Sequence, residues 1–191
     1  METPRAWSFI VLGDDRQYAG NEGYLDELGR LYRYDSHVAN HKQVSRGDVA
    51  ILRGHDKVLG IATILYITSK TGTKTMNRCP NCNRTSIKPR TTKLPEYRCH
   101  HCHHEFEAPV TEVAAVTLYE AHYEDSYLHT PEVISIDRLK NAVLRPSDQV
   151  SIEEISLLEL EPSFLHLFPA SQEMFAAFRR SAVQGARRTP S

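Results

Sequence analysis

The sequence contains no apolar run of the roughly 18 to 20 residues that a membrane-spanning helix requires. Residues 1–5 likewise lack the apolar core of a secretion signal. The formal net charge is only −1, so the chain as a whole carries no excess charge that would attract a polyanion or a membrane surface. We therefore expect a cytoplasmic protein with no membrane partner, in which any charged binding surface is local.

Cysteine is scarce, and its four copies occur as two pairs. Cys79 and Cys82 form one Cys-x-x-Cys pair, Cys99 and Cys102 form the other, and 16 residues separate the pairs. Thiols in the cytoplasm stay reduced, which favours metal binding over disulfides. Two such pairs complete the tetrahedral coordination of one Zn²⁺ ion, and four thiolates leave no open position for a substrate. The spacing therefore predicts a structural zinc ribbon.

Histidines crowd the second cysteine pair, at His100, His101, His103 and His104. One of them could replace a cysteine as ligand. We favour the four cysteines, because their paired spacing is complete without a histidine.

The segment between and around the cysteine pairs is basic. From Lys74 to Arg98 the chain has seven Lys and Arg residues against Glu96 alone, a net charge of +6. Cations on a metal-stapled finger are suited to neutralising phosphates, although a charge run can also be a solvated loop. The residues that we expect to bind phosphate are Arg78, Arg84, Lys88, Arg90 and Lys93.

Apolar patterns predict a mixture of strands and helices. Short strands are expected at residues 7–12 and 49–52, at 58–67 with a bulge or bend at Gly60, at 110–119, and once or more within 150–160. Helices are expected at 136–142 and from Ser171 onward, where Met174, Phe175, Phe178 and Ala182 form an apolar stripe. The fold class is α+β, with a carboxy-terminal helix.

The cysteine segment interrupts this pattern as an insertion in a β-hairpin. We expect residues 1–70 and 110–185 to form one discontinuous domain and residues 71–109 to form the inserted zinc ribbon, here called the ribbon. Residues 186–191 read as a linker or tail.

Aromatic and polar residues are concentrated between residues 18 and 40, which hold four of the nine tyrosines. Aromatic rings with nearby carboxylates and amides are what is needed to stack on a base and recognise its edge. Composition alone favours the simpler alternative, in which the tyrosines pack on the body of the domain with their hydroxyls outward.

Several short motifs together resemble a known family. Residues 7–16, 18–24, 34–36, 86–88 and 97–99 look like the amino-terminal recognition domain that precedes HNH nuclease domains in bacterial restriction-type endonucleases. The Gly47-Asp48 turn and Leu59-Gly60 are also similar to the PUA-like group of small barrels, which includes the EVE and SRA readers of modified bases. The resemblance implies a PUA-like β pseudo-barrel whose pocket accepts a flipped base.

The resemblance also implies a binding partner and a site. The partner would be double-stranded DNA, with a modified base, and a carboxy-terminal HNH nuclease domain could follow. An HNH nuclease requires histidines as general base and metal ligand, and the interval from Cys82 to Cys99 contains no histidine. We therefore expect that this chain lacks the nuclease residues and is not itself an enzyme. The predicted base pocket consists of Trp7 as its floor, Tyr18, Asn21, Tyr32, Tyr34, Asp35 and Ser36.

Three other functions are compatible with the same residues. A PUA-like domain with a structural zinc ribbon can bind RNA instead of DNA. The chain could be a small hydrolase or nuclease, although no nucleophile and base stand out. The ribbon could also bind a protein, in which case no salt-dependent binding of nucleic acid would be seen.

Overall fold

The computed structural model describes residues 3–11, 17–18, 21–22, 26–146 and 150–186. The chain forms two compact units, which are described separately. The first unit consists of residues 1–12, 26–69 and 118–191, and the second of residues 13–25 and 70–117. Of the predicted tail at residues 186–191, residue 186 ends the last helix, and residues 187–191 lie outside the described residues.

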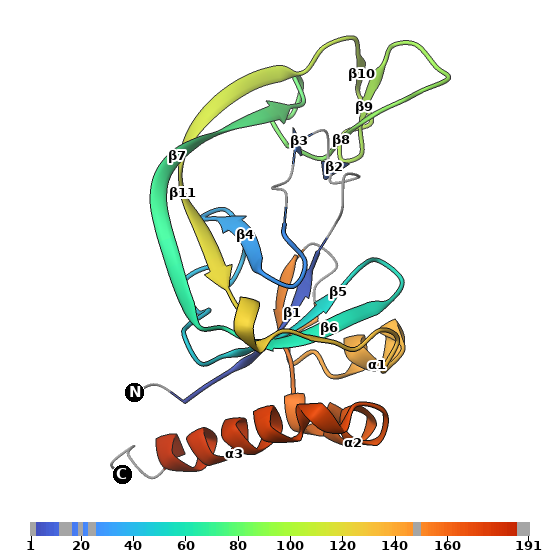
Figure 1. The fold of residues 1–191 in the computed structure, drawn as a ribbon. Helices are drawn as coiled ribbons and strands as arrows, with labels where there is room; N and C mark the ends of the chain where they lie inside the picture. The colour runs from blue at the N-terminus through green and yellow to red at the C-terminus, as the bar shows by residue number, and fades with distance from the viewer. Residues whose placement is uncertain (1–2, 12–16, 19–20, 23–25, 147–149, 187–191) are drawn as a thin grey trace. The chain divides into compact units, whose positions relative to one another are not determined.

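A five-stranded sheet forms the centre of the first unit (Figure 1). Strand β1 pairs in parallel with β5, and the other neighbours in the sheet are antiparallel. Strands β1 and β5 are buried almost throughout, which explains their continuous apolar sequences. In sheet order the strands are β12 (Leu128–His129), β6 (Val58–Thr63), β5 (Val49–Arg53), β1 (Ala6–Ile10) and β13 (Ile152–Glu154).

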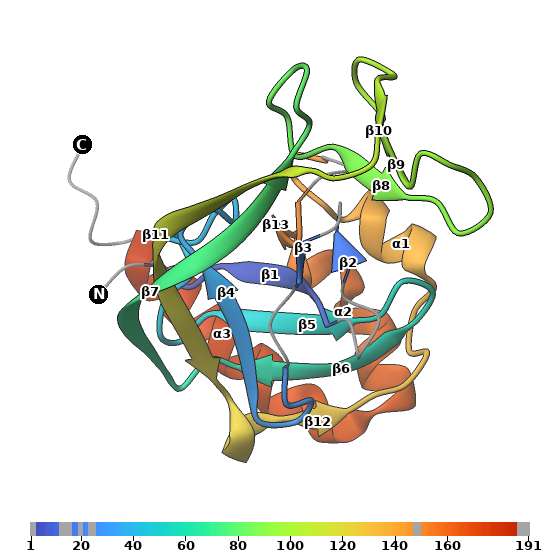
Figure 2. The same ribbon diagram turned by 90° about the horizontal axis from the view of Figure 1, so that it is seen from above.

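Each face of this sheet supports a separate apolar cluster. Val49 and Ile51 of β5 pack with helical residues such as Leu160, whereas Ala50 and Leu52 pack with Tyr32 and other residues on the opposite face. The alternation follows from the period of two in a β-strand. Figures 1 and 2 show the helices on one side of the sheet and β4 on the other.

The second sheet of the chain has the order β4-β11-β7. Its strands are β4 (Leu31–Asp35), β11 (Val110–His122) and β7 (Tyr66–Arg78). We expected one strand from residue 58 to residue 67, but the chain leaves the first sheet after Thr63. Ile64 donates its N–H to Asp48 and Leu65 donates to His122, so these two residues move the chain from one sheet to the other. Strand β7 then runs without a break past residue 71, where we had placed the start of the ribbon.

Helices follow the sheets in the sequence. Helix α1 (Ile136–Asn141) begins at its N-cap Ser135, and the final helix α3 (Gln172–Ala186) begins next to Ser171, as predicted. Two short 3₁₀ helices lie at Glu124–Ser126 and Pro169–Ser171. Across the described residues, no helix combines the length and the apolar character that crossing a bilayer requires.

Helix α2 (Leu157–Leu167) corrects the sequence-based assignment of residues 150–160. Only Ile152–Glu154 of that segment form a strand. Leu157, Leu160 and Phe164 are the buried residues of α2, and their spacing of three and four positions is that of one helix face. The apolar residues before residue 156 therefore belong to a strand, and those after it follow the repeat of a helix, whereas the sequence had predicted only strand in this segment.

The predicted fold class is confirmed at the level of α+β, with strands predominating. The sheets that the structure describes do not close into a barrel. The second unit contains the carboxy-terminal part of β7, the amino-terminal part of β11 and a small sheet of order β10-β9-β8. These three strands are β8 (Ile87–Pro89), β9 (Tyr97–Cys99) and β10 (Glu105–Phe106), and β2 (Gln17–Tyr18) pairs separately with β3 (Asn21–Glu22).

Gly60 marks the bulge that its sequence position predicted. The register of β5 against β6 shifts between Leu52 and Arg53, which are opposite Gly60 and Val58. Leu59 is therefore the extra residue on β6. A side chain at position 60 would meet the ring of Tyr127, and its Cβ would lie 2.7 Å from the carbonyl oxygen of Leu128.

We predict that Gly60→Ala lowers the free energy of unfolding by about 1 to 3 kcal/mol, because the added methyl group overlaps backbone and a packed ring. Denaturant unfolding of the two proteins measures the difference. Gly54→Ala is the matched control, since a Cβ there meets its nearest neighbours at 3.8 Å. Equal losses at both positions would contradict the assignment of a close approach at Gly60.

Candidate metal centre and nucleic-acid interface

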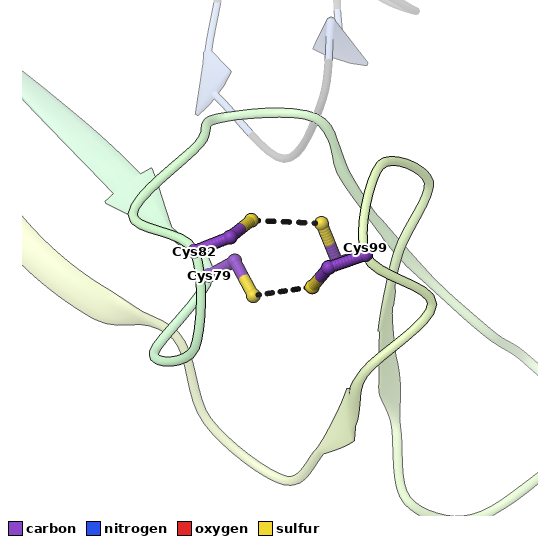
Figure 3. A group of neighbouring side chains, drawn as sticks. Cys79, Cys82 and Cys99 are labelled. Atoms are coloured by element: carbon purple, nitrogen blue, oxygen red, sulfur yellow. Dashed lines mark hydrogen bonds between the residues drawn. The ribbon is translucent and has the colours of Figure 1, made fainter.

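The four cysteines converge on one point in the second unit. The Sγ atoms of Cys79 and Cys102 are 3.6 Å apart, and those of Cys82 and Cys99 are 3.5 Å apart. All four sulfur atoms lie within 4.8 Å of one another. Figure 3 shows the first pair facing the second from two separate loops.

These distances fit a metal ion bound by four sulfur atoms. A tetrahedron with metal–sulfur bonds of about 2.3 Å has edges of about 3.8 Å. A disulfide would require about 2.05 Å, and all four cysteines are free thiols. The four thiols therefore form a tetrathiolate site that could hold a metal ion, as the sequence spacing predicted.

The two cysteine loops have the same backbone hydrogen bonds. The N–H of Asn83 donates to the carbonyl of Cys79 at 2.9 Å, and the N–H of His103 donates to that of Cys99 at 3.0 Å. Cys79 and Cys99 in turn donate their N–H groups to residues 84 and 104, both at 2.9 Å. Asn83 and His103 both adopt the left-handed conformation, with φ of 58° and 61°. Each loop thus reverses the chain in the same way and turns its two thiols toward the same side.

The environment of the thiols favours charge on one of them and opposes it on another. The backbone N–H of His104 and the side chain of Asn81 lower the pKa of Cys102 to about 6. The backbone N–H of Arg84 lowers the pKa of Cys82, but desolvation and hydrogen bonds with the other three thiols outweigh it and raise this pKa to about 12. Four thiolates at these distances repel one another, so full ionisation requires a cation among them.

The histidines near the second pair are not part of this cluster. His100, His101, His103 and His104 are all exposed, and the group of ligand atoms in the described residues consists of the four sulfurs. The ring of His104 stacks on Phe106 at 5.8 Å. The preference for cysteine over histidine as ligand agrees with this geometry.

Two of the five predicted phosphate-binding residues are held by carboxylates within the ribbon and its flanking strands. Arg78 pairs with Glu112 and also donates to the carbonyl of Asn83. Arg90 pairs with Glu105 at 2.6 Å, and its side chain is only 18% exposed. Glu105 has a lowered pKa, mainly because of its hydrogen bond with Arg90. Both arginines therefore stabilise the second unit internally.

Cations without such partners lie on the outer face of the small sheet. Lys88 of β8 stands directly opposite Arg98 of β9, and both are exposed. Like charges at this position destabilise an antiparallel pair. Arg98 is flanked on its other side by Glu105, whose carboxylate is engaged by Arg90. Arg84 and Lys93 are also exposed, and the ion pairs found among the described residues do not involve either of them.

Arg98 was not among the residues that we expected to bind phosphate. It contributed to the charge count of the segment, but nothing in the sequence distinguished it from other basic residues. Only the register of β8 against β9 places it opposite Lys88.

The predicted base-pocket residues are divided between the two units. Tyr18 and Asn21 belong to the second unit, whereas the other five belong to the first, where most of them are core residues. Trp7 is fully buried, and its Nε1 donates to Asp48 at 2.7 Å. Asp48 also accepts the backbone N–H groups of Arg5 and Ser45, while burial raises the pKa of its carboxyl. Through these hydrogen bonds the carboxylate connects the turn at residues 45–48 to β1 and to the residue before it.

Tyr32 and Tyr34 are also buried, with 1% and 2% of their surface exposed. Tyr32 stacks on Phe9 with ring centroids 4.5 Å apart, and Tyr34 stacks on Tyr119 at 5.1 Å. Neither ring has an exposed face on which a base could stack in this arrangement. Packing on the body of the domain therefore accounts for both rings, but the outward hydroxyl that composition favoured is wrong for Tyr34, whose hydroxyl is buried.

The remaining predicted pocket residues have diverse settings. Asp35 is fully buried and accepts the backbone N–H of His37 at 2.7 Å, so it caps the turn that follows β4. Ser36 is half-buried. Tyr18 and Asn21 are opposite each other in the β2–β3 pair, and their side chains lie outside the described part of the structure. A role of these residues in base recognition stays a prediction.

One part of this region has polar atoms without partners. The hydroxyl of Tyr34 and Nε2 of His41 are buried and have no hydrogen-bond partner. Both rings contact Tyr119, that of His41 at 5.7 Å between centroids. His41 and Tyr119 were not among the predicted pocket residues. A buried polar group without a hydrogen-bond partner lowers the free energy of unfolding, so such a group often forms a hydrogen bond with a ligand or a water molecule.

No family model matches the chain, and comparisons with curated proteins and with solved structures found no match.

We predict that replacing any one of the four cysteines by serine reduces bound metal from about one equivalent to near zero, because the remaining three thiolates bind far more weakly. Elemental analysis of the purified full chain gives the ratio of metal to protein. His101→Ala is the control, since His101 is exposed and outside the cluster, and it should retain the metal. Loss of metal in the histidine variant alone would contradict the tetrathiolate site.

Proposed function

We propose that this chain is a DNA-binding recognition module in which a zinc-bound ribbon contacts the phosphate backbone. The observation that carries the proposal is the pair formed by Lys88 and Arg98, two exposed cations opposite each other on neighbouring strands. An anion bound between them would relieve their repulsion. A row of phosphates supplies such anions at regular spacing, and each contact releases counterions from the DNA.

Zinc is the metal that suits this centre best. Four cysteine thiolates in a tetrahedral arrangement are typical of structural zinc sites in proteins. The apolar core of the ribbon is small, since its buried residues are Cys79, Ile87, Cys99 and Phe106. The metal would therefore supply much of the free energy that orders β8 and β9, and with them the two cations.

The first unit would recognise a base. Its five-stranded sheet, strand β4 and the Gly47-Asp48 turn are compatible with the PUA-like pseudo-barrel that the sequence resembles, and the resemblance implies a modified, flipped base in such a domain. Tyr34 and His41 supply polar atoms that lack partners and could hydrogen-bond to the edge of a base. The rings that pack around Tyr34 would have to part to admit the base. An HNH nuclease partner domain, cleaving the DNA that this module selects, completes the proposal.

We predict that Lys88→Ala and Arg98→Ala each weaken binding to every duplex sequence to a similar extent. Each loss should also reduce the slope of log affinity against log salt concentration by about 0.9, as expected for one lost phosphate contact. Fluorescence anisotropy with a labelled duplex at several salt concentrations measures both quantities. A slope that is unchanged in both variants would contradict backbone contact at this pair.

Lys57→Ala is the matched control for these variants. Lys57 is an exposed lysine in the hairpin turn between β5 and β6 of the first unit, so its loss changes the net charge equally. Competition between modified duplex DNA and structured RNA distinguishes the RNA-binding alternative. Equal affinity for unmodified RNA would exclude DNA as the preferred ligand.

We predict that Tyr34→Phe reduces discrimination between modified and unmodified duplexes by about tenfold while leaving the free energy of unfolding unchanged or slightly higher. The variant removes only a hydroxyl that has no partner in the protein, so the fold loses no hydrogen bond. The measurement is a binding screen of duplexes that differ only in a cytosine or adenine modification, together with denaturant unfolding.

Tyr123→Phe provides the comparison. The Tyr123 hydroxyl is likewise buried without a partner, and burial raises the pKa of both phenols, so both stay protonated at neutral pH. Tyr123 does not contact Tyr119 through a stacked ring pair as Tyr34 does. Discrimination that falls equally in both variants, or in neither, argues against base recognition at Tyr34.

A further inference from the structure

Leu94 is the most exposed of the large apolar side chains that lie on the described surface, at 89%. It lies in the loop between β8 and β9, and residues 91–94 of this loop are all exposed. Leu94 does not belong to the small apolar cluster of the ribbon, which contains Ile87, Phe106 and the cysteines. The fold of the ribbon therefore does not account for a leucine at this position.

Hydrogen bonds from Arg90 hold the loop that carries Leu94. The backbone N–H of Arg90 donates to the carbonyl of Glu96 at 2.6 Å and so joins the two ends of the loop. Its guanidinium donates twice to the carbonyl of Pro95, the residue after Leu94, and once to Glu105. A side chain presented by a braced loop loses little conformational freedom when it binds.

The charges around the loop define what it would meet. Lys93 precedes Leu94 and is exposed, and the two strands that the loop joins carry Lys88 and Arg98. An apolar tip surrounded by cations is poorly suited to an apolar protein surface, because the cations would lose their hydration without compensation. It suits a ligand with a polyanionic exterior and stacked apolar faces within, and duplex DNA has both.

We propose that Leu94 is a wedge that inserts between two neighbouring base pairs when the ribbon binds duplex DNA. The inference rests on the proposed function, because it requires the cations of β8 and β9 to hold the backbone on either side. Apolar side chains that enter a base step partly unstack it and bend the duplex. Leu94 then contributes the distortion of the DNA, whereas Lys88 and Arg98 contribute the salt-dependent affinity.

The test uses the full chain and duplexes that carry a single 2-aminopurine at successive positions, because the emission of this base rises when it unstacks. We expect the wild-type protein and Leu94→Met to raise the emission at one or two neighbouring positions, and Leu94→Ala to abolish the rise. Affinity of Leu94→Ala should fall by about tenfold with the salt slope unchanged, since an apolar contact is lost and no phosphate contact is.

Val113→Ala is the matched control, because Val113 is another exposed apolar residue of the second unit, at 66%, on strand β11. It should leave both emission and affinity as in the wild type. The wedge is overturned if the wild-type protein binds duplexes without unstacking any position, or if Leu94→Ala unstacks them as the wild type does; in both cases phosphate binding by the ribbon survives. Absence of duplex binding by the wild type removes the proposed function itself and the wedge with it.

Discussion

The convergence of four sulfur atoms is the constraint on which the second unit depends. Around them the ribbon buries only Ile87 and Phe106 as apolar side chains, which is too little to offset the conformational entropy lost in ordering two loops and three short strands. A cation among the thiolates would overcome their mutual repulsion and tie both loops together. Because Cys99 is part of β9, that tie would also hold the register of β8 against β9, in which Lys88 and Arg98 are opposite each other.

The four-cysteine cluster could be predicted from the sequence because its determinants are local. Two thiols three positions apart meet the same ion whatever the surrounding fold, so the spacing of Cys79, Cys82, Cys99 and Cys102 was sufficient. The positive charge of the ribbon could also be predicted from the sequence. Counting charged residues did not, however, distinguish cations that pair with a carboxylate from cations that do not. Arg78 and Arg90 hold carboxylates, whereas Arg98 emerged only from strand register, which depends on contacts between distant residues.

In the first unit the sequence predicted element types better than it predicted environments. The bulge at Gly60 and the helices at residues 136 and 172 were expected, whereas Leu157 and Leu160 were assigned to a strand because a short apolar run does not define a period. Tyr32 and Tyr34 are residue types suited to a base pocket, but both lie in the core. Strand β4 carries them, and their rings stack on Phe9 of β1 and on Tyr119 of β11. Burial is a property of the whole fold, and an aromatic residue type alone does not reveal it.

The equivalent backbone of the two cysteine loops has a consequence for how this protein can vary. Orientation of the thiols comes from main-chain hydrogen bonds and from the left-handed residues at positions 83 and 103. Of the four residues inside the loops, Asn81 also hydrogen-bonds to the thiol of Cys102, so the residues left to vary are Pro80 in one loop and the exposed His100 and His101 in the other. Related chains are free to exchange them, and the tip of the ribbon can acquire a different surface chemistry while its metal centre stays the same.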